Sequence, residues 1–311
     1  MGSGSGFGKV ILFNEHFVVY GVPGIVSAID SVAQAEVRRT GEGIALKDAR
    51  KGAEGYTEKK KTQQKESIER MLRAMGINPE KTSLEIWLGG NLPGFSGIGA
   101  SAASSVAIAR AIAEEFKMDL PDERINEIAY EAEKAYAGTP SGIDNSAATY
   151  GGLIWFKKAM SGGPNIIEKL TMEEPVEIII GNTGIVADTK EMVAGVAARK
   201  EKNPERYNLL FKQAGEVALE ARTALKAFDL RKVGKLMNES HRLLREIEVS
   251  CEELDCLVNL VQEQGAFGAK LTGGGGGGCM VALTPGKNLQ EKAATTIEDE
   301  GFKVLRTKIG V

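Results

Sequence analysis

The chain has 311 residues, of which 42% are hydrophobic and 26% are charged, an ordinary composition for a globular protein. Its formal net charge of −3 gives no general attraction to nucleic acids or anionic membranes. No apolar stretch is long enough to span a bilayer, and no basic segment followed by an apolar one marks a secretory signal. We therefore expect a cytoplasmic protein of about two domains, without nucleic acid or membrane as a partner.

Cysteine and histidine are scarce. The three cysteines, Cys251, Cys256 and Cys279, are odd in number and form no CxxC pair, which argues against a disulfide framework or a zinc site. The two histidines, His16 and His241, nearly exclude a histidine-rich metal site. We expect buried or incidental thiols in a reducing compartment, and we assign no role to His241.

The first hundred residues contain short strand patterns and one clear helix pattern. Apolar, β-branched runs predict strands at 10–13 and 17–20. Residues 47–63 are polar and mixed in charge, which predicts a solvated loop or the start of a helix. Thr62 is expected to cap a helix with apolar residues at i, i+3, i+4 and i+7. Alternating apolar residues predict a strand at 83–89.

A loop of small residues follows that strand and opens a helix. Residues 91–105 are dominated by glycine, serine and alanine, and apolar residues at helical spacing follow them. The free N–H groups and the positive dipole end of such a helix attract anions. A tight turn without a ligand is the alternative, but a turn alone does not need small residues over about ten positions.

A second helix is predicted near 123–137, with Glu133 at the edge of its apolar face. A carboxylate there needs a cation or hydrogen bonds, so either a plain salt bridge or a magnesium ligand is expected. The helix ends in a segment rich in glycine and proline that leads to Asp144. Asp144 is expected on a structured turn, where an aspartate is usually a cap or an Asx-turn.

The C-terminal half has a mixed pattern of helices and strands, and the change of composition at 157–172 marks the best domain boundary. The predicted strands are 176–180, 268–272, 279–284 and 302–307, and the predicted helices are 205–227, 229–247, 252–264 and 288–300.

Six consecutive glycines, Gly273 to Gly278, stand between apolar flanks that are typical of buried strands. Glycine loses more backbone entropy on folding than any other residue, so the run needs a reason. The usual reason is a backbone that closely approaches another backbone or a phosphate. We expect the run to pack closely on the small-residue loop at 91–105.

The sequence does not match the common phosphate-binding motifs. A Walker loop is excluded because Gly8-Lys9 is followed by Val10 and has Ser3 where the first glycine belongs. The dinucleotide fingerprint fits the glycine run only trivially, and the motifs of eukaryotic protein kinases are absent.

Four ordered segments instead resemble the GHMP kinases, and within that superfamily the chain is similar to the mevalonate kinase family. These segments are Gly8–Gly21, Pro93–Ser105, Glu133–Asn145 and Ala269–Leu283, with further likeness at Asp188–Val193 and Thr307–Val311. The resemblance implies an α+β, two-lobed fold with its active site in the cleft between the lobes. It implies an N-terminal domain over 1–165 and a ferredoxin-like C-terminal domain over 166–311.

The resemblance also implies an activity, which is transfer of the γ-phosphoryl group of ATP to the terminal hydroxyl of mevalonate in isoprenoid biosynthesis. Mg²⁺ is the implied cofactor, and a homodimer is a possible assembly. Asp144 is expected as general base, with Lys9 beside it stabilising the alkoxide. Ser101 and Glu133 are expected to bind the metal. The residues expected to bind ATP are Pro93, Gly94, Gly97, Ile98, Gly99, Ala100, Ser101, Ala102, Ser104 and Ser105. The residues expected to bind mevalonate are Glu15, His16, Asp144, Thr189, Gly274 and Gly275.

Several readings stay open. Lys9 could be a solvated lysine, His16 a satisfied core histidine, and Thr189 a helix cap. The chain departs from the family pattern at Phe7, Asn14, Ala100 and Gly274. Asn14 can keep a left-handed turn that glycine usually makes. The glycine-serine start at residues 1–6 resembles an expression tag, but Phe7 between Gly6 and Gly8 suggests that part of it is native. A sister kinase acting on phosphomevalonate, homoserine or a sugar, a decarboxylase of the same fold, and a non-catalytic nucleotide-binding module are the alternatives.

Overall fold

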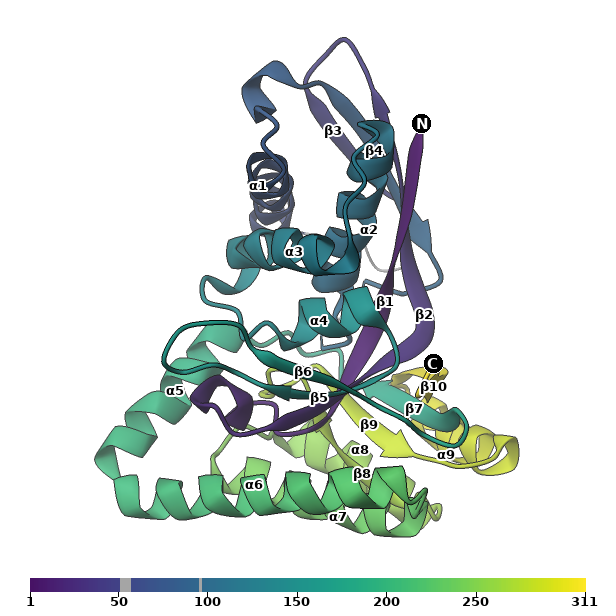
Figure 1. Ribbon diagram of the computed structural model, residues 1–311. Coiled ribbons are helices and arrows are strands. Elements are labelled where there is room, and N and C mark those ends of the chain that lie inside the picture. Colours follow the sequence, from purple (N-terminus) through teal and green to yellow (C-terminus); the bar gives the residue numbers. More distant parts are fainter. Residues whose placement is uncertain (51–56, 95–96) are drawn as a thin grey trace. The chain divides into compact units, whose positions relative to one another are not determined.

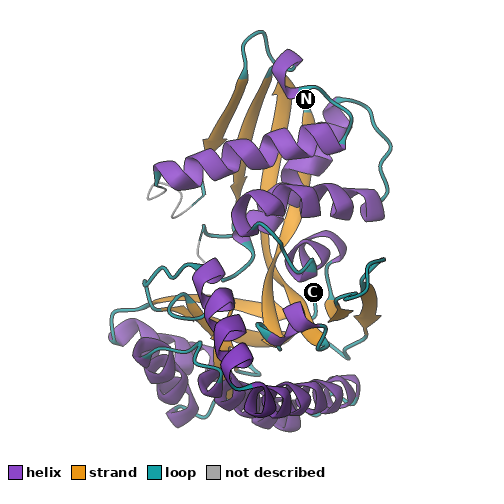
Figure 2. Ribbon diagram, turned by 90° about the vertical axis from the view of Figure 1, so that its left-hand side faces the viewer, coloured by secondary structure: helices purple, strands orange, loops and turns teal. Residues whose placement is uncertain are grey.

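The computed structural model describes residues 1–50, 57–94 and 97–311, and it contains both helices and strands, as the predicted α+β class requires (Figures 1 and 2). Two compact units divide the chain. The first unit consists of Met1–Lys9, Asp30–Phe95 and Gly99–Gly151. The second unit consists of Val10–Ile29, Ser96–Ile98 and Gly152–Val311. Both are discontinuous in sequence, because strands β1 (Gly2–Phe13) and β2 (Gly24–Arg39) each contribute residues to both units.

The first unit is a sheet with helices on one face (Figures 1 and 2). Strand β4 pairs with β2 in antiparallel fashion and with β3 in parallel, and β1 pairs with β2. Helix α3 packs against both α1 and α2. The remaining elements of this unit are β3 (Ile44–Asp48), α1 (Glu58–Ala74), the 3₁₀ turn η3 (Pro79–Lys81), β4 (Leu84–Gly90), α2 (Ala100–Glu115), α3 (Asp122–Ala137) and α4 (Ile143–Tyr150).

The glycine-rich start of the chain is part of this packing. A strand was predicted only from residue 10, but β1 begins at Gly2. Its alternate residues Gly2, Gly4 and Gly6 face α2, where an added Cβ would lie 2.1–2.3 Å from a helix carbonyl oxygen. The carbonyls belong to residues 111, 107 and 103, one helical turn apart. Only glycine lets the strand lie this close to the helix, so the start of the chain is structural.

The second unit has an antiparallel sheet in the order β10–β7–β9–β8, with the edge pairs β2–β5 and β5–β6. Helices α6 and α7 pack on each other, α7 and α8 on β8, and α9 on β7 and β10. The elements are η1 (Phe17–Tyr20), β5 (Leu153–Lys157), β6 (Ile166–Leu170), β7 (Val176–Asn182), α5 (Thr189–Lys202), α6 (Pro204–Lys226), α7 (Leu230–Glu246), α8 (Glu252–Glu263), β8 (Gly268–Thr272), β9 (Cys279–Leu283), α9 (Lys287–Asp299) and β10 (Lys303–Ile309).

The helices and strands predicted beyond residue 175 are confirmed to within about two residues. The strand predicted at 17–20 is wrong, because Phe17–Tyr20 is a 3₁₀ helix. Its start is set by Asn14, whose φ of +74° confirms the left-handed turn and whose side-chain amide donates to two backbone carbonyls. The apolar run is buried against an aromatic cluster around Phe211 rather than in a sheet.

The expected capping of the first long helix is also wrong. Thr57, not Thr62, caps α1 by accepting from the backbone of Lys60, and the Thr62 hydroxyl donates to the carbonyl of Glu58. Residues 47–63, predicted as a solvated loop or the start of a helix, contain the end of β3 and the start of α1, so the helix start is confirmed, while 51–56 lie outside the described residues.

None of the helices in the described ranges is both long and apolar enough to cross a membrane. All three cysteines are free thiols, as expected, and Cys279 is buried.

Candidate functional site

A buried lysine and an aspartate form an ion pair within the first unit. Lys9, at the end of β1 in this unit, is 2% exposed, and its Nζ lies 2.9 Å from Oδ1 of Asp144. The lysine stem passes over Gly99, where a Cβ would lie only 2.6 Å from the lysine Cγ. Lys9 is therefore not a solvated lysine, because its side chain is buried and its ammonium group forms an ion pair with a carboxylate.

Asp144, which was predicted on a structured turn, lies in the first turn of helix α4. The helix begins after Gly142, whose φ of +92° suits glycine, and Ser146 donates to the Gly142 carbonyl. Asn145 donates its side-chain amide to the Asn126 backbone and side chain on α3. These bonds hold Asp144 in place, and the positive end of the short helix favours its negative charge.

The small-residue loop leads into α2 as predicted. Gly99 has a φ of +72° and precedes the first helical residue, Ala100. The first N–H groups of α2 have no partner inside the helix and are suited to bind an anion. The Ser104 hydroxyl donates to the Ala100 carbonyl at 2.6 Å. Of the loop residues before the helix, Phe95 and Ser96 lie outside the described residues.

The carboxylate of Glu133 on α3 accepts hydrogen bonds from two hydroxyl groups on α2. Ser101 and Ser105 donate to its two carboxylate oxygens at 3.1 and 3.3 Å. Burial and the negative charge of Asp144 raise the pKa of Glu133 to about 7, against the hydroxyls and the positive charge of Lys60. The structure thus brings together Ser101, Ser105, Glu133 and Asp144, all within one unit.

These oxygens fit a magnesium ion. Carboxylate and hydroxyl oxygens are hard donors, and a divalent cation would relieve the repulsion between Glu133 and Asp144. Within the described ranges no three His, Cys, Asp or Glu side chains converge as a metal cage. A magnesium ion here would therefore complete its shell with phosphate oxygens and water, as Mg²⁺ commonly does.

Two cations near the start of α2 were not predicted. Arg50 is buried, binds both oxygens of Asp48, and donates to the Ala100 carbonyl at 3.3 Å. The Lys60 ammonium lies 5.1 Å from the centre of the Tyr136 ring, and burial lowers the pKa of Lys60. Both residues come from the segment interpreted as solvated, and nothing in its polar composition separates a buried arginine from an exposed one.

In the second unit, three of the residues expected to bind substrate meet. The Nε2 of His16 lies 2.9 Å from the carbonyl oxygen of Gly274, and a Cβ on Gly274 would lie 2.5 Å from the Thr189 Oγ1. Thr189 is the first residue of α5 and is not its cap, because Asp188 accepts from the Lys190 backbone at 2.8 Å. The capping alternative for Thr189 is therefore wrong.

Lys270 on β8 is a functional candidate that the sequence reasoning missed. Its side chain is 0% exposed and forms an ion pair with Glu15, whose side chain is 1% exposed. Lys270 also donates to the Leu271 carbonyl at 2.6 Å. A lysine inside an otherwise apolar strand was the available signal, since a buried lysine almost always has a partner.

The glycine run packs mainly within the second unit. A Cβ at Gly275 would lie 2.0 Å from the Val249 carbonyl oxygen, and one at Gly277 would lie 2.7 Å from Ile185. Gly273 does approach the predicted loop, because a Cβ there would lie 2.8 Å from the Cα of Gly97. The expected close approach to the loop is confirmed at that one residue, while the others serve the packing of their own unit.

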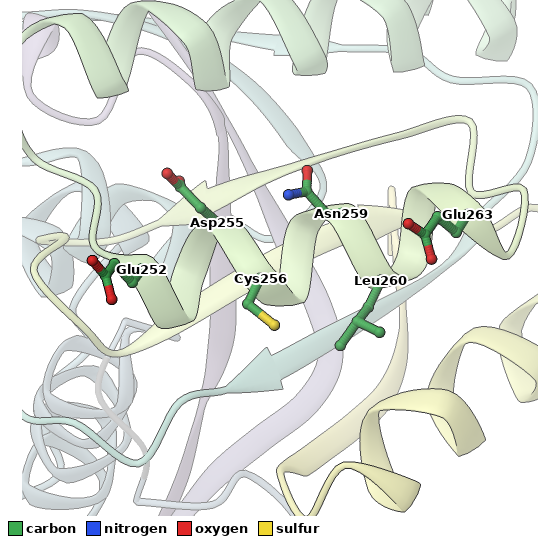
Figure 3. A pocket seen from close by; sticks show the side chains of 6 residues that line it. All are labelled: Glu252, Asp255, Cys256, Asn259, Leu260 and Glu263. Atoms are coloured by element: carbon green, nitrogen blue, oxygen red, sulfur yellow. The ribbon is translucent and has the colours of Figure 1, made fainter.

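A surface hollow of about 450 Å³ lies along α8, away from these residues in sequence (Figure 3). All of its lining residues come from this one helix, and three of them are acidic. They are Glu252, Asp255, Cys256, Asn259, Leu260 and Glu263. An acidic, one-sided lining repels phosphate groups, so the hollow is not a candidate nucleotide site.

Comparison with known proteins decides the family. Residues 64–152 match the family described as GHMP kinases N terminal domain, and residues 221–303 match GHMP kinases C terminal. The chain belongs to the GHMP kinase family. It is 32% identical to a mevalonate kinase of Thermococcus sibiricus over 97% of this chain and 94% of that protein. It is also 32% identical to a mevalonate kinase of Pyrococcus abyssi, over 97% of this chain and 93% of that protein.

A solved structure agrees with these relatives. This GHMP kinase superposes on L. major mevalonate kinase in complex with R-mevalonate with a TM-score of 0.92 and 35% identity, covering 99% of this chain and 96% of that one. The two family matches lie on either side of the boundary proposed at residues 165 and 166. That boundary stays a prediction.

Proposed function

We propose that this GHMP kinase transfers the γ-phosphoryl group of ATP to the terminal hydroxyl of mevalonate, giving 5-phosphomevalonate. The two mevalonate kinases compared above align with this chain along almost their whole length. The similar solved structure is a mevalonate kinase in complex with R-mevalonate. The observation that carries the chemistry is the ion pair between buried Lys9 and partly exposed Asp144, in the same unit as Glu133 and the N-terminus of α2.

The first unit is proposed to bind ATP. Phosphoryl transfer depends mainly on positioning and on neutralising charge, since the transition state spreads negative charge over the phosphoryl oxygens. The N–H groups of Ser101 and Ala102, which have no partner inside helix α2 because they lie in its first turn, suit the phosphates. The other proposed contacts come from the preceding loop and from Ser104 and Ser105. Mg²⁺, when bound by Ser101 and Glu133, would supply further neutralisation of the phosphates.

Asp144 is proposed to accept the proton of the terminal hydroxyl, which makes the oxygen a better nucleophile. Lys9 holds the aspartate at 2.9 Å and places a positive charge where the alkoxide develops. Because the lysine is almost fully buried, its charge acts with little screening by water. The two side chains therefore act as one catalytic pair.

The second unit is proposed to bind mevalonate through Glu15, His16, Thr189, Gly274 and Gly275. Lys270 is a positioning residue, because its ion pair orients the Glu15 carboxylate without itself reaching solvent.

A coupled assay of ADP release with R-mevalonate tests the function. Turnover should require Mg²⁺, and Asp144→Asn should lower kcat by orders of magnitude while ATP still binds. Asp122→Asn is a matched control, because this aspartate pairs with Arg110 at 2.6 Å on the neighbouring helix and is half exposed. Absence of turnover with mevalonate would refute the proposal, as would full activity of Asp144→Asn.

The same assay separates the alternatives. Phosphomevalonate, homoserine and sugars identify a sister kinase, and carbon dioxide release from a diphosphorylated acid identifies a decarboxylase. A non-catalytic nucleotide-binding module would show no turnover with any alcohol. A cytoplasmic location and a homodimer stay predictions.

A further inference from the structure

Strand β8 lies at the end of its sheet, and side chains of α7 bind its backbone. In the order β10–β7–β9–β8 the strand pairs with β9, and the N–H groups of an edge strand need acceptors from elsewhere. The N–H of Ala269 donates to Oδ1 of Asn238 at 2.9 Å. The N–H of Leu271 donates to Nδ1 of His241 at 3.4 Å. Asn238 and His241 are three residues apart on α7, so one face of this helix holds the strand.

Asp255 on α8 fixes the tautomer of His241. Nε2 of the ring lies 3.1 Å from Oδ1 of Asp255. The hydroxyl of Ser250 donates to the same oxygen at 2.6 Å, and Arg245 forms an ion pair with the other oxygen at 2.9 Å, so this carboxylate acts as an acceptor. Nε2 therefore carries the proton, and Nδ1 keeps the lone pair that accepts from the backbone. Burial is the largest cause that lowers the pKa of His241, so the ring is neutral at pH 7.

The stretch of β8 that α7 holds carries a buried ion pair. Lys270 lies between Ala269 and Leu271, the two residues whose N–H groups α7 accepts. Its ammonium forms an ion pair with Glu15 and donates to the Leu271 carbonyl at 2.6 Å. The side chains of Lys270 and Glu15 are 0% and 1% exposed, so water cannot compensate for a shift of either charge. A displacement of Leu271 therefore displaces the ammonium, and with it the Glu15 carboxylate.

We propose that His241 is a positioning residue for the substrate: in its Nε2–H tautomer it holds the edge of β8 and thereby places the Lys270 ammonium and the Glu15 carboxylate. The inference rests on the proposed function, in which Glu15 binds mevalonate. His241 acts through the strand and does not contact the substrate. The contacts from Asp255 through His241 to Glu15 all lie within the second unit.

Nitrogen NMR of the full chain tests the tautomer, because the protein has only two histidines. The His16→Gln variant leaves only the signals of His241. At pH 7 the ring of His241 should be neutral with its proton on Nε2. A proton on Nδ1 would overturn the inference, because such a ring cannot accept from the Leu271 N–H.

Two amide variants of His241 test the hydrogen bond to the strand. The amide of His241→Asn can place its oxygen near Nδ1, whereas the amide of His241→Gln extends toward Asp255 and leaves the Leu271 N–H without its acceptor. One lost hydrogen bond should raise KM for R-mevalonate about tenfold in His241→Gln. His241→Asn should restore much of this loss. The kcat and KM for ATP should change little, because Lys9 and Asp144 lie in the first unit.

Amide hydrogen exchange measures the hold on the strand directly. The Leu271 N–H should exchange faster in His241→Gln than in wild type, and at close to the wild-type rate in His241→Asn. Val233→Ala is the matched control, because it removes buried apolar packing from α7 without removing a hydrogen bond. It should lower stability while KM for mevalonate stays near the wild-type value. Equal exchange of Leu271 in wild type and His241→Gln, or an equal rise of KM in Val233→Ala, would overturn the inference.

The outcomes separate the two proposals. If wild type phosphorylates mevalonate but His241→Gln keeps the wild-type KM, the inference about His241 fails and the kinase function stands. If wild type does not phosphorylate mevalonate, the proposed function fails, and the inference that rests on it fails as well.

Discussion

Replacing Gly4 by alanine tests whether the glycine-rich start of β1 packs against α2 and stabilises the fold. The new Cβ would lie 2.3 Å from the carbonyl oxygen of Ala107 and 2.7 Å from the nitrogen of Ala111. Unstrained contacts between such atoms are about 3.5 Å, so β1 and α2 must separate by about 1 Å. Overpacking of this kind lowers the free energy of unfolding by about 1–3 kcal/mol.

Function should suffer as well, because β1 carries Lys9 and α2 carries Ser101. A shift between these elements changes the geometry around the ion pair of Lys9 and Asp144, and displacements near 1 Å can cost about 100-fold in rate. We therefore expect kcat to fall in Gly4→Ala even where the protein remains folded.

Ser5→Ala is the matched control. The Ser5 side chain is exposed, and Arg110 binds its backbone carbonyl, which the substitution keeps. Its effect on stability should stay within about 0.5 kcal/mol. Urea unfolding and the ADP-release assay, run on both variants, measure the two effects. Equal unfolding free energies and equal kcat values would refute the reasoning and make the start of the chain dispensable.

Three further changes have defined outcomes. Gly275→Ala puts a Cβ 2.0 Å from a backbone carbonyl oxygen at a φ of +72°, so stability should fall by about 1–3 kcal/mol and KM for mevalonate should rise; unchanged values would contradict the close approach. Burial lowers the pKa of both His16 and His241 below the ordinary 6.5, so the unfolded chain binds protons that the folded chain rejects. The contribution of the histidines to stability should be complete above about pH 6.5 and fall toward pH 4, by about 2 kcal/mol at pH 5 from His16 alone. The raised pKa of Glu133 changes stability in the opposite direction over this range, so the test uses Glu133→Gln, in which equal urea midpoints at pH 5 and 7.5 would count against the histidine effect. Lys270→Met leaves the buried Glu15 without its ion-pair partner and should lower the free energy of unfolding by about 3–5 kcal/mol, most of which the double variant with Glu15→Leu should restore; no recovery in urea unfolding would argue against the pair.

The two histidines show what a local sequence pattern can and cannot predict about the role of a residue. Sequence reasoning placed His16 at the substrate through resemblance and gave His241 no role. In the structure both are buried and held by backbone atoms of the Lys270–Gly274 stretch, yet among the described residues only the His16 ring has a nitrogen without a hydrogen-bond partner. The hydrogen bond between His16 and Gly274 joins residues 258 positions apart, so a local sequence pattern cannot predict it.

The amino-acid order alone revealed the features whose signal is local. Helical spacing located α6, α7 and α8, the small residues before α2 indicated an anion site, and the ordered motifs indicated the kinase family. These features depend on neighbours within a few positions, so a window of sequence contains their cause.

The remaining features depend on partners that are distant in the chain. The 16 residues of β2 went unrecognised because a strand is stabilised by the strands beside it, here β4 and β5. The Lys270–Glu15 pair joins residues 255 positions apart, and the glycines of β1 are explained only by the helix backbone against them. A buried ion pair or a close backbone contact needs two segments that only folding brings together, so neither segment alone reveals it.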